Sequence, residues 1–156
     1  MKISYLSENI EDLKEVSRWY FEEWGFLNSS ITQQKIYDGL SEKLKKDDDF
    51  LCLITVHEAE KLVAVADLKY REHKEYPEYE HWIGGVFVVP SHRGKGYASA
   101  LIRRAKEHTI ELGIYELYLQ CEEHNEGLYT KHGFKPLHSA VHSGVNTKIF
   151  KYKSST

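Results

Sequence analysis

A short glycine-bearing segment holds the residues whose types and spacing most clearly suggest chemistry. Arg93-Gly94-Lys95-Gly96 follows an apolar run that ends at Pro90, and it leads directly into a helical pattern. Glycines let the backbone turn tightly and expose its N–H groups, while the start of a helix adds unpaired donors and the positive end of the helix dipole. An anionic pyrophosphate suits such a turn, so the segment is interpreted as a phosphate-binding site.

The glycine spacing alone has low specificity, because a turn between a strand and a helix can also open a dinucleotide-binding fold. The surrounding pattern argues against that alternative. The apolar runs before the turn predict an antiparallel meander, and one further helix is expected after it, whereas a doubly wound sheet alternates strands and helices. The phosphate-binding turn is therefore expected within a different α/β arrangement.

Hydrophobic periodicity and turn residues predict the elements that come before this turn. Apolar residues at three- and four-residue spacing mark helices, and β-branched runs bounded by polar turns mark strands. The expected elements are a strand over 2–6, a helix that ends at Trp24 with Gly25 as its stop, a helix capped by Thr32 that runs to Leu44, and an antiparallel hairpin of strands over 50–56 and 62–70 around a turn at 57–61.

The second half of the chain continues the same pattern. A strand is expected over 81–89, and its Gly84-Gly85 pair is typical of a bulge or of the close approach of a ligand backbone. The remaining expected elements are a helix over 95–112 stopped by Gly113, a strand over 115–121, a short helix over 123–132 ended by Gly133, and a closing hairpin of strands over 134–141 and 147–153.

Composition limits the class of protein. With 156 residues, 41% hydrophobic and 29% charged, the chain is expected to form a single domain over 1–156. It contains no run of about 18 apolar residues and begins without a signal-peptide pattern, so no membrane partner and a cytoplasmic location are expected. A net charge of -3 argues against a nucleic-acid partner.

The cysteines and histidines do not predict a metal site. Cys52 and Cys121 both fall in expected strands, which favours two buried, reduced thiols over a disulfide. His138 and His142 stand four apart on an expected strand, where they share a face but lie too far apart to bind one ion easily. No metal is therefore expected.

Two motifs make the chain resemble the GNAT superfamily of acyl-CoA-dependent N-acetyltransferases. The superfamily signature is Gln or Arg, two residues, Gly, one residue, then Gly or Ala, and residues 93–98 match it as Arg-Gly-Lys-Gly-Tyr-Ala. A Tyr shortly before Gly-Phe recurs as Tyr129 before Gly133-Phe134. The resemblance covers the whole order of elements. It implies an α/β (α+β) GNAT fold, with a mixed, mostly antiparallel central sheet of about seven strands flanked by four helices.

The resemblance also implies acetyl-CoA as cosubstrate. The pyrophosphate would bind the amides of residues 94–99, and the pantetheine arm would run along residues 86–88 like an added strand. Tyr129 falls at the general-acid position, with a core tyrosine as the alternative. Many members carry an Asn seven residues before that tyrosine, where this chain has Glu122, and Asn125 could still reach the cosubstrate. The cosubstrate-binding residues implied in this way are Val86, Phe87, Val88, Arg93, Gly94, Lys95, Gly96, Tyr97, Ala98, Ser99 and Asn125.

The general base departs from the family pattern. Superfamily members carry a glutamate or histidine on the third meander strand, but the matching positions here are Trp82 and Gly84, which cannot accept a proton. Glu80 and His81 lie just upstream and are the candidate bases. The other carboxylates nearby are Glu78 and Asp67. An amine already deprotonated by solvent, accelerated by proximity, is the other alternative.

The acceptor is expected to bind between the first two helices, the 71–80 loop and the closing hairpin. Glu78 and Glu80 would favour a cationic primary amine, on a small molecule or a peptide. Because the base is missing, a noncatalytic acyl-CoA-binding module is the alternative function. Exposed aromatics would suit a homodimer contact equally well. The aromatic residues that could line the acceptor site are Trp19, Trp24, Tyr37, Tyr76, Tyr79 and Trp82.

Overall fold

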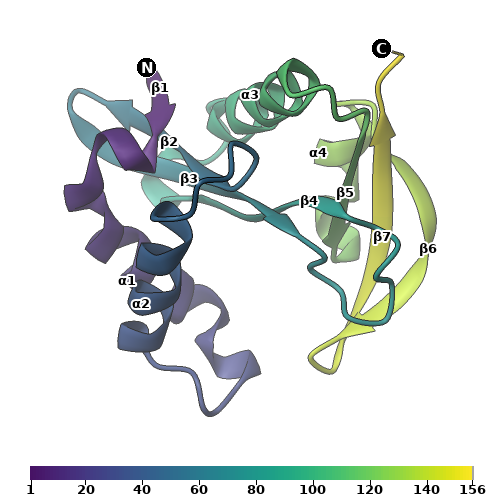
Figure 1. Cartoon of the computed structure of the whole chain (residues 1–156), viewed down its shortest axis with the longest axis horizontal. Helices are drawn as coiled ribbons and strands as arrows, with labels where there is room; N and C mark the ends of the chain where they lie inside the picture. Colours follow the sequence, from purple (N-terminus) through teal and green to yellow (C-terminus); the bar gives the residue numbers. More distant parts are fainter. Residues whose placement is uncertain (156) are drawn as a thin grey trace.

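The computed structural model describes residues 1–155. Its strands form one seven-stranded sheet in the order β1-β2-β3-β4-β5-β7-β6 (Figure 1). Every neighbouring pair is antiparallel except β4 and β5, which run parallel. The mixed, mostly antiparallel sheet implied by the resemblance is thus confirmed. The strands are β1 (Lys2–Tyr5), β2 (Cys52–Glu58), β3 (Lys61–Tyr70), β4 (His81–Val88), β5 (Glu116–Cys121), β6 (Lys135–His142) and β7 (Val145–Lys153).

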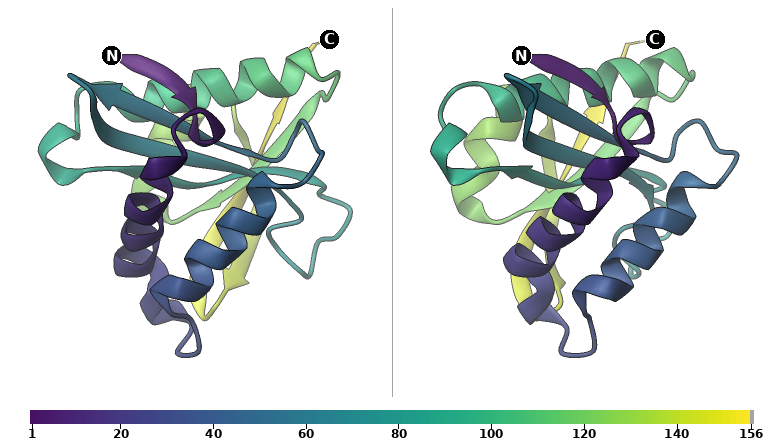
Figure 2. Two further views of the ribbon diagram at one scale, coloured as in Figure 1. Left: turned by 60° about the vertical axis from the view of Figure 1, so that its left-hand side comes forward. Right: turned by 90° about the vertical axis from the view of Figure 1, so that its left-hand side faces the viewer.

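Four α-helices within residues 1–155 cover the two faces of this sheet. α1 (Leu13–Trp24) and α2 (Gln33–Leu44) lie side by side on one face, and α3 (Tyr97–Glu111) lies on the other, together with α4 (Glu126–Thr130) (Figure 2). Alternation along each strand divides the core between these faces. Leu53 and Val65 pack toward α1 and α2, whereas Ile54 and Ala66 pack toward α3.

Two helix boundaries form as their capping residues predict. Thr32 accepts a hydrogen bond from the Lys35 N–H at 3.1 Å, which caps the start of α2. Gly113 adopts a φ of +75° just beyond α3, a left-handed conformation that ends a helix at little cost for glycine. Both signals lie within a few residues of the bond that they control, so the sequence pattern was sufficient.

Three local predictions need correction. α1 ends at Trp24 as expected, but Gly25 has a right-handed φ of -60° and is not a left-handed stop. A Cβ on Gly25 would come within 2.8 Å of the Phe21 ring, so close packing explains the glycine. The β2–β3 turn comprises only residues 59–60, both at positive φ, and the two strands extend to meet it. The helix expected over 123–132 is a 3₁₀ turn at 123–125 followed by α4.

Both cysteines are free, and Cys121 is buried as predicted, whereas Cys52 is only partly buried. Burial raises the pKa of Cys52 to about 12 and that of Cys121 to about 11. Thiolate is the reactive form of cysteine, so both side chains are protonated and unreactive near neutral pH. No helix within residues 1–155 is long and apolar enough to cross a membrane.

Candidate functional site

The two parallel strands at the centre of the sheet separate soon after they meet. β4 and β5 share a single register pair, Trp82 with Tyr118, in the described part of the chain, whereas β5 pairs with β7 over its whole length. Beyond Trp82, the edge of β4 that faces β5 therefore has no strand partner. Backbone groups at an open edge can pair with an extended ligand that carries amides.

A β-bulge lies at the point where β4 leaves β5. Gly85 and Val86 together face one residue of β3, Ala66. Gly85 has a φ of +53°, and its carbonyl accepts a hydrogen bond from Tyr20 Oη of α1 at 2.7 Å. The Val86 N–H belongs to the same planar peptide unit as that carbonyl and so points away from Tyr20. The Gly84-Gly85 pair thus marks a bulge, as its sequence suggested, and α1 holds the bulge in place.

The segment after β4 exposes a row of backbone donors. Within residues 1–155, no acceptor is found for the N–H groups of residues 94–99, and the first bond of α3 is donated by Ala100 to the Gly96 carbonyl. Gly94 and Gly96 have φ values of +76° and +88°, and no atom lies within 4 Å of a Cβ built on either. Free amides at the start of a long helix, next to open space, form an anion-binding cradle.

Several side chains around the cradle have other partners. Arg93 Nε donates to the Val88 carbonyl at 2.9 Å, and its guanidinium lies over the Phe87 ring. Tyr97 Oη donates to Glu58 at 2.8 Å, and Ser99 Oγ is hydrogen-bonded to His132 at 2.9 Å. The backbone of this segment, more than its side chains, is therefore available to a ligand.

The remaining residues expected at the cosubstrate lie around the same gap. Val86 and Ala98 are half-buried and pack against the core that α3 covers. Val88 is buried, and Lys95 is exposed beside the two glycines. Asn125 is exposed just before α4, with its amide 3.2 Å from the ring of His124.

Tyr129 of α4 has a buried ring and an available hydroxyl. Within residues 1–155, Tyr129 Oη has no hydrogen-bond partner. Every fully buried side-chain oxygen or nitrogen among these residues does have a partner, so Tyr129 Oη is not fully buried and reaches accessible space. Burial raises the pKa of Tyr129 well above its ordinary value, and the neighbouring Cys121 and Glu72 raise it further. The phenol therefore stays protonated at neutral pH and can donate a proton.

The missing side chain at Gly84 leaves space that another residue fills. A Cβ on Gly84 would overlap Glu72 Oε1 and come within 2.7 Å of Lys69 Cε. Glu72 pairs with Lys69 Nζ at 2.7 Å and accepts a hydrogen bond from Gln120 Nε2 at 3.1 Å. Sequence reasoning missed Glu72, because it lies in the 71–80 loop, where spacing does not indicate which way a carboxylate points.

Asp67 and Lys69 are charged residues on the same face of β3. Asp67 is paired with Lys43 of α2, which also donates to the Leu68 carbonyl at 2.6 Å. Burial alone would lower the pKa of Lys69, but the neighbouring Glu72 and Asp67 carboxylates raise it above the ordinary value. Lys69 therefore remains an ammonium, and the Asp67 carboxylate is already engaged.

The candidate bases Glu80 and His81 lie at the start of β4. Glu80 is about half exposed, 3.8 Å from Arg71, and His81 Nε2 lies 3.9 Å from its carboxylate. The His81 ring packs between Phe50 and Tyr70. Residues 81 and 84 face opposite sides of the strand, so His81 lies on the α3 side, away from the space beside Gly84. Burial lowers the pKa of His81.

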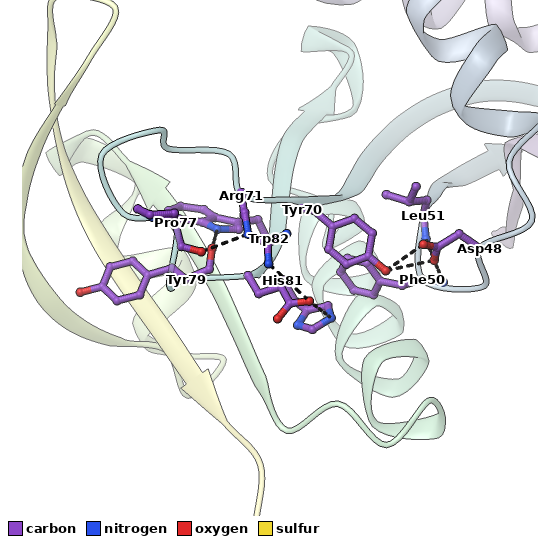
Figure 3. Close-up of polar contacts among 10 residues, drawn as sticks. Asp48, Phe50, Leu51, Tyr70, Arg71, Pro77, Tyr79, His81 and Trp82 are labelled. Carbon is purple, nitrogen blue, oxygen red and sulfur yellow. Dashed lines mark hydrogen bonds and ion pairs between the residues drawn. The ribbon is translucent and has the colours of Figure 1, made fainter.

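The 71–80 loop packs over the second half of the sheet through aromatic contacts. The Tyr79 ring stacks on Tyr118 with centroids 4.5 Å apart, and Tyr79 Oη lies 2.8 Å from His138. The buried Trp82 donates from its indole to the Tyr79 carbonyl at 2.6 Å (Figure 3). Tyr76 stacks on Tyr79 in turn. These rings hold Glu72 and its loop over β5.

The aromatics of α1 and α2 divide by exposure. Trp19 is buried and contacts Phe87 of β4, with ring centroids 5.1 Å apart. Trp24 and Tyr37 are about one-third exposed, at the end of α1 and in the first half of α2. Of these three, Trp24 and Tyr37 are available to a ligand. In the described residues there is no group of three His, Cys, Asp or Glu side chains that could hold a metal ion.

Comparisons with known proteins agree with this arrangement. The model of the acetyltransferase (GNAT) family matches residues 13–134. N-alpha-acetyltransferase MAK3 of Arabidopsis thaliana is 32% identical over 87 residues, which cover 54% of this chain and 44% of that protein. The chain thus matches less than half the length of this relative.

Solved structures share the fold at low sequence identity. The ribosomal-protein-alanine N-acetyltransferase of Brucella melitensis superposes with a TM-score of 0.76 at 14% identity, covering 99% of this chain and 100% of that chain. An N-acetyltransferase of Staphylococcus aureus Mu50 gives 0.74 at 15% identity, with 97% of each chain covered. At these identities the likeness shows the fold alone.

Proposed function

Since this chain belongs to the acetyltransferase (GNAT) family, we propose that it transfers an acetyl group from acetyl-CoA to a primary amine of a small molecule or peptide. One observation carries the proposal. The open edge of β4 leads directly to the unpaired amides of residues 94–99. An extended arm with a pyrophosphate at its far end fits that continuous surface.

The residues around the gap fit acetyl-CoA, which would supply the activated thioester. The amides of residues 94–99 would bind its pyrophosphate, and Gly94 and Gly96 leave the necessary space. The backbone of residues 86–88 would pair with the amides of the pantetheine arm. A β4 N–H near Val86 would stabilise the negative charge that develops on the thioester oxygen.

Tyr129 would act as the general acid. Its hydroxyl is free of other partners, and its raised pKa keeps it protonated at neutral pH. The departing CoA sulfur needs a proton, which a nearby phenol can supply. Asn125 would contact the cosubstrate from the start of α4.

The acceptor is proposed to be a cationic amine. The exposed carboxylates of Glu78 and Glu80 lie in the 71–80 loop, where they would attract a positive charge. The name of the Arabidopsis relative describes it as an N-alpha-acetyltransferase, which supports a peptide α-amine for this chain. A small-molecule amine is consistent with the same charges.

Release of CoA thiol from acetyl-CoA tests the proposal. We expect turnover with at least one amine from a panel of tetra-alanine peptide, lysine and spermidine. Tyr129→Phe should lower kcat by about 100-fold with little change in acetyl-CoA affinity, because a general acid acts in the transition state. Tyr115→Phe, which removes a hydroxyl from an exposed tyrosine, is the matched control and should keep wild-type kcat.

The alternative is a noncatalytic acyl-CoA-binding module, for which the missing base on β4 is the specific observation. Tight acetyl-CoA binding without turnover on any amine of the panel would favour this alternative. An unchanged kcat in Tyr129→Phe would remove the acid role but leave transfer intact. Turnover on the amine panel therefore tests the reaction itself, and kcat of Tyr129→Phe tests whether Tyr129 is its acid.

A further inference from the structure

The space beside Gly84 contains a carboxylate that comes from another element. Superfamily resemblance implies a proton acceptor on β4, and Gly84 provides none. The Glu72 side chain comes from the 71–80 loop, and its Oε1 lies where a Cβ of residue 84 would be. The carboxylate therefore reaches the missing position from outside the strand, one residue from the bulge at Gly85.

The Glu72 carboxylate is held in a fixed orientation. Lys69 Nζ contacts Oε1 at 2.7 Å, and Gln120 Nε2 donates to Oε2 at 3.1 Å. Thr147 Oγ1 of β7 donates in turn to Gln120 Oε1 at 3.1 Å. A carboxylate has about four acceptor positions, so each oxygen can accept another hydrogen bond. The Glu72 side chain is mostly buried, with 14% exposed, which leaves access from one side.

The position of Glu72 also relates it to the expected acid. Glu72 Oε1 lies against Gly84, next to the bulge residue whose carbonyl Tyr20 holds. Tyr129 packs in the core that α3 covers, on the other face of the sheet. Burial raises the pKa of Tyr129, and the Glu72 carboxylate adds to that rise.

We propose that Glu72 is the general base that deprotonates the acceptor amine. The inference rests on the proposed acetyl transfer. Glu72 takes a proton from the ammonium, and the neutral nitrogen forms a bond to the thioester carbonyl carbon. The C–S bond breaks, the sulfur receives a proton from Tyr129, and the nitrogen loses its second proton, which restores Tyr129 through solvent. The proton held by Glu72 leaves to solvent, so the balance is one amide, one CoA thiol and one released proton.

Two nucleophiles of different charge test this role. Spermidine carries ammonium groups that stay charged at pH 8 and need a base, whereas hydroxylamine is largely uncharged at pH 8 and does not. Glu72→Gln should lower kcat for spermidine by about 100-fold and change kcat for hydroxylamine less than about twofold. Acetyl-CoA affinity should be unchanged. Glu75→Gln, an exposed carboxylate of the same loop, is the matched control and should behave as wild type.

A carboxylate transplant provides an independent test. Glu72→Ala removes the atom nearest to a Cβ at residue 84, and Lys69 Cε, 2.7 Å from that Cβ, is near the end of a flexible side chain that can move. Gly84→Glu in that background would therefore place a carboxylate there from β4 itself. We expect the double variant to recover at least about 10-fold of the kcat lost in Glu72→Ala. In Gly84→Glu alone the new Cβ would overlap Glu72 Oε1, so one of the two side chains must move, and we expect no gain in kcat over wild type.

The outcomes separate the base role from a purely structural one. Equal losses with hydroxylamine and spermidine, or no recovery in the double variant, would mean that Glu72 only anchors the loop, and the inference would be overturned. Full activity of Glu72→Gln would also overturn it. A wild-type protein with no turnover on any amine would instead refute the proposed function.

Discussion

Two regions along β4 are built in different ways. Beyond its carboxyl end, the candidate phosphate cradle consists of backbone amides from one segment, residues 94–99. Near its middle, the space beside Gly84 is filled by Lys69 of β3 and Glu72 of the loop, and Gln120 of β5 donates a hydrogen bond to Glu72. The first depends on local conformation, and the second on tertiary packing.

This difference predicts that the two regions respond differently to substitution. Backbone amides are present whatever the side chains are, so the cradle needs little beyond glycines and a helix start. A site built from packed side chains changes with each substitution in any contributing element. Variants at residues 94–99 and variants beside Gly84 should therefore separate cosubstrate binding from turnover.

The largest expected effect is at the cradle. Gly96→Asp forces an L residue to a φ of +88° and places a negative charge beside the expected pyrophosphate. Like charges in contact cost several kcal/mol, so acetyl-CoA affinity should fall by at least about 100-fold, as measured by calorimetry. Gly113→Asp makes the same change at a φ of +75° beyond the other end of α3. If Gly113→Asp weakened binding equally, the phosphate would not be at the cradle.

An intermediate effect is expected at the Gly85 bulge, which lies between the space beside Gly84 and the cradle. Gly85→Ala imposes a left-handed φ on an L residue and places a Cβ 2.6 Å from Tyr20 Oη, so the bulge must shift. Strain of about 1–2 kcal/mol corresponds to roughly a 10-fold loss in kcat/KM. In the control, Gly39→Ala on the exposed face of α2, no atom lies within 4 Å of the new Cβ and activity should be unchanged. Wild-type kcat/KM in Gly85→Ala would show that the bulge geometry does not matter.

The smallest effect is expected in the loop that carries Glu72. Tyr79→Phe removes the hydrogen bond to His138 but keeps the stack on Tyr118. Chemical denaturation should show a loss of about 1 kcal/mol in unfolding free energy, with acetyl-CoA affinity unchanged. Tyr115→Phe serves again as the exposed control. A loss of acetyl-CoA affinity in Tyr79→Phe would mean that cosubstrate binding at the cradle depends on the packing of the 71–80 loop.

Most of the fold was predictable because its signals are local. The cap at Thr32 and the stop at Gly113 act over one helical turn, and strand alternation is set by neighbouring residues. The errors came where the residue type alone does not decide the local conformation. Gly25 resembles a helix stop, yet the Phe21 ring explains it, and the Ala59-Glu60 turn adopts positive φ without any glycine.

The candidate site divides in the same way. The cradle was expected from its glycines, and the structure adds that its amides are unpaired. His81 looked like a base because it precedes Gly84 closely in sequence, but strand alternation directs it to the α3 face. Glu72 is farther from Gly84 in sequence, and the loop returns its carboxylate to that residue.

The sequence by itself determined the order of elements, the glycine turn that is proposed to bind phosphate and the position of Tyr129, because each depends on short-range spacing. Only the tertiary structure decided which carboxylate fills the space at Gly84. That choice depends on how the 71–80 loop packs, through Tyr79 on Tyr118 and Trp82 beneath it, and on the Lys69 and Gln120 contacts that orient Glu72. These contacts join residues far apart in the chain, and no local pattern records them.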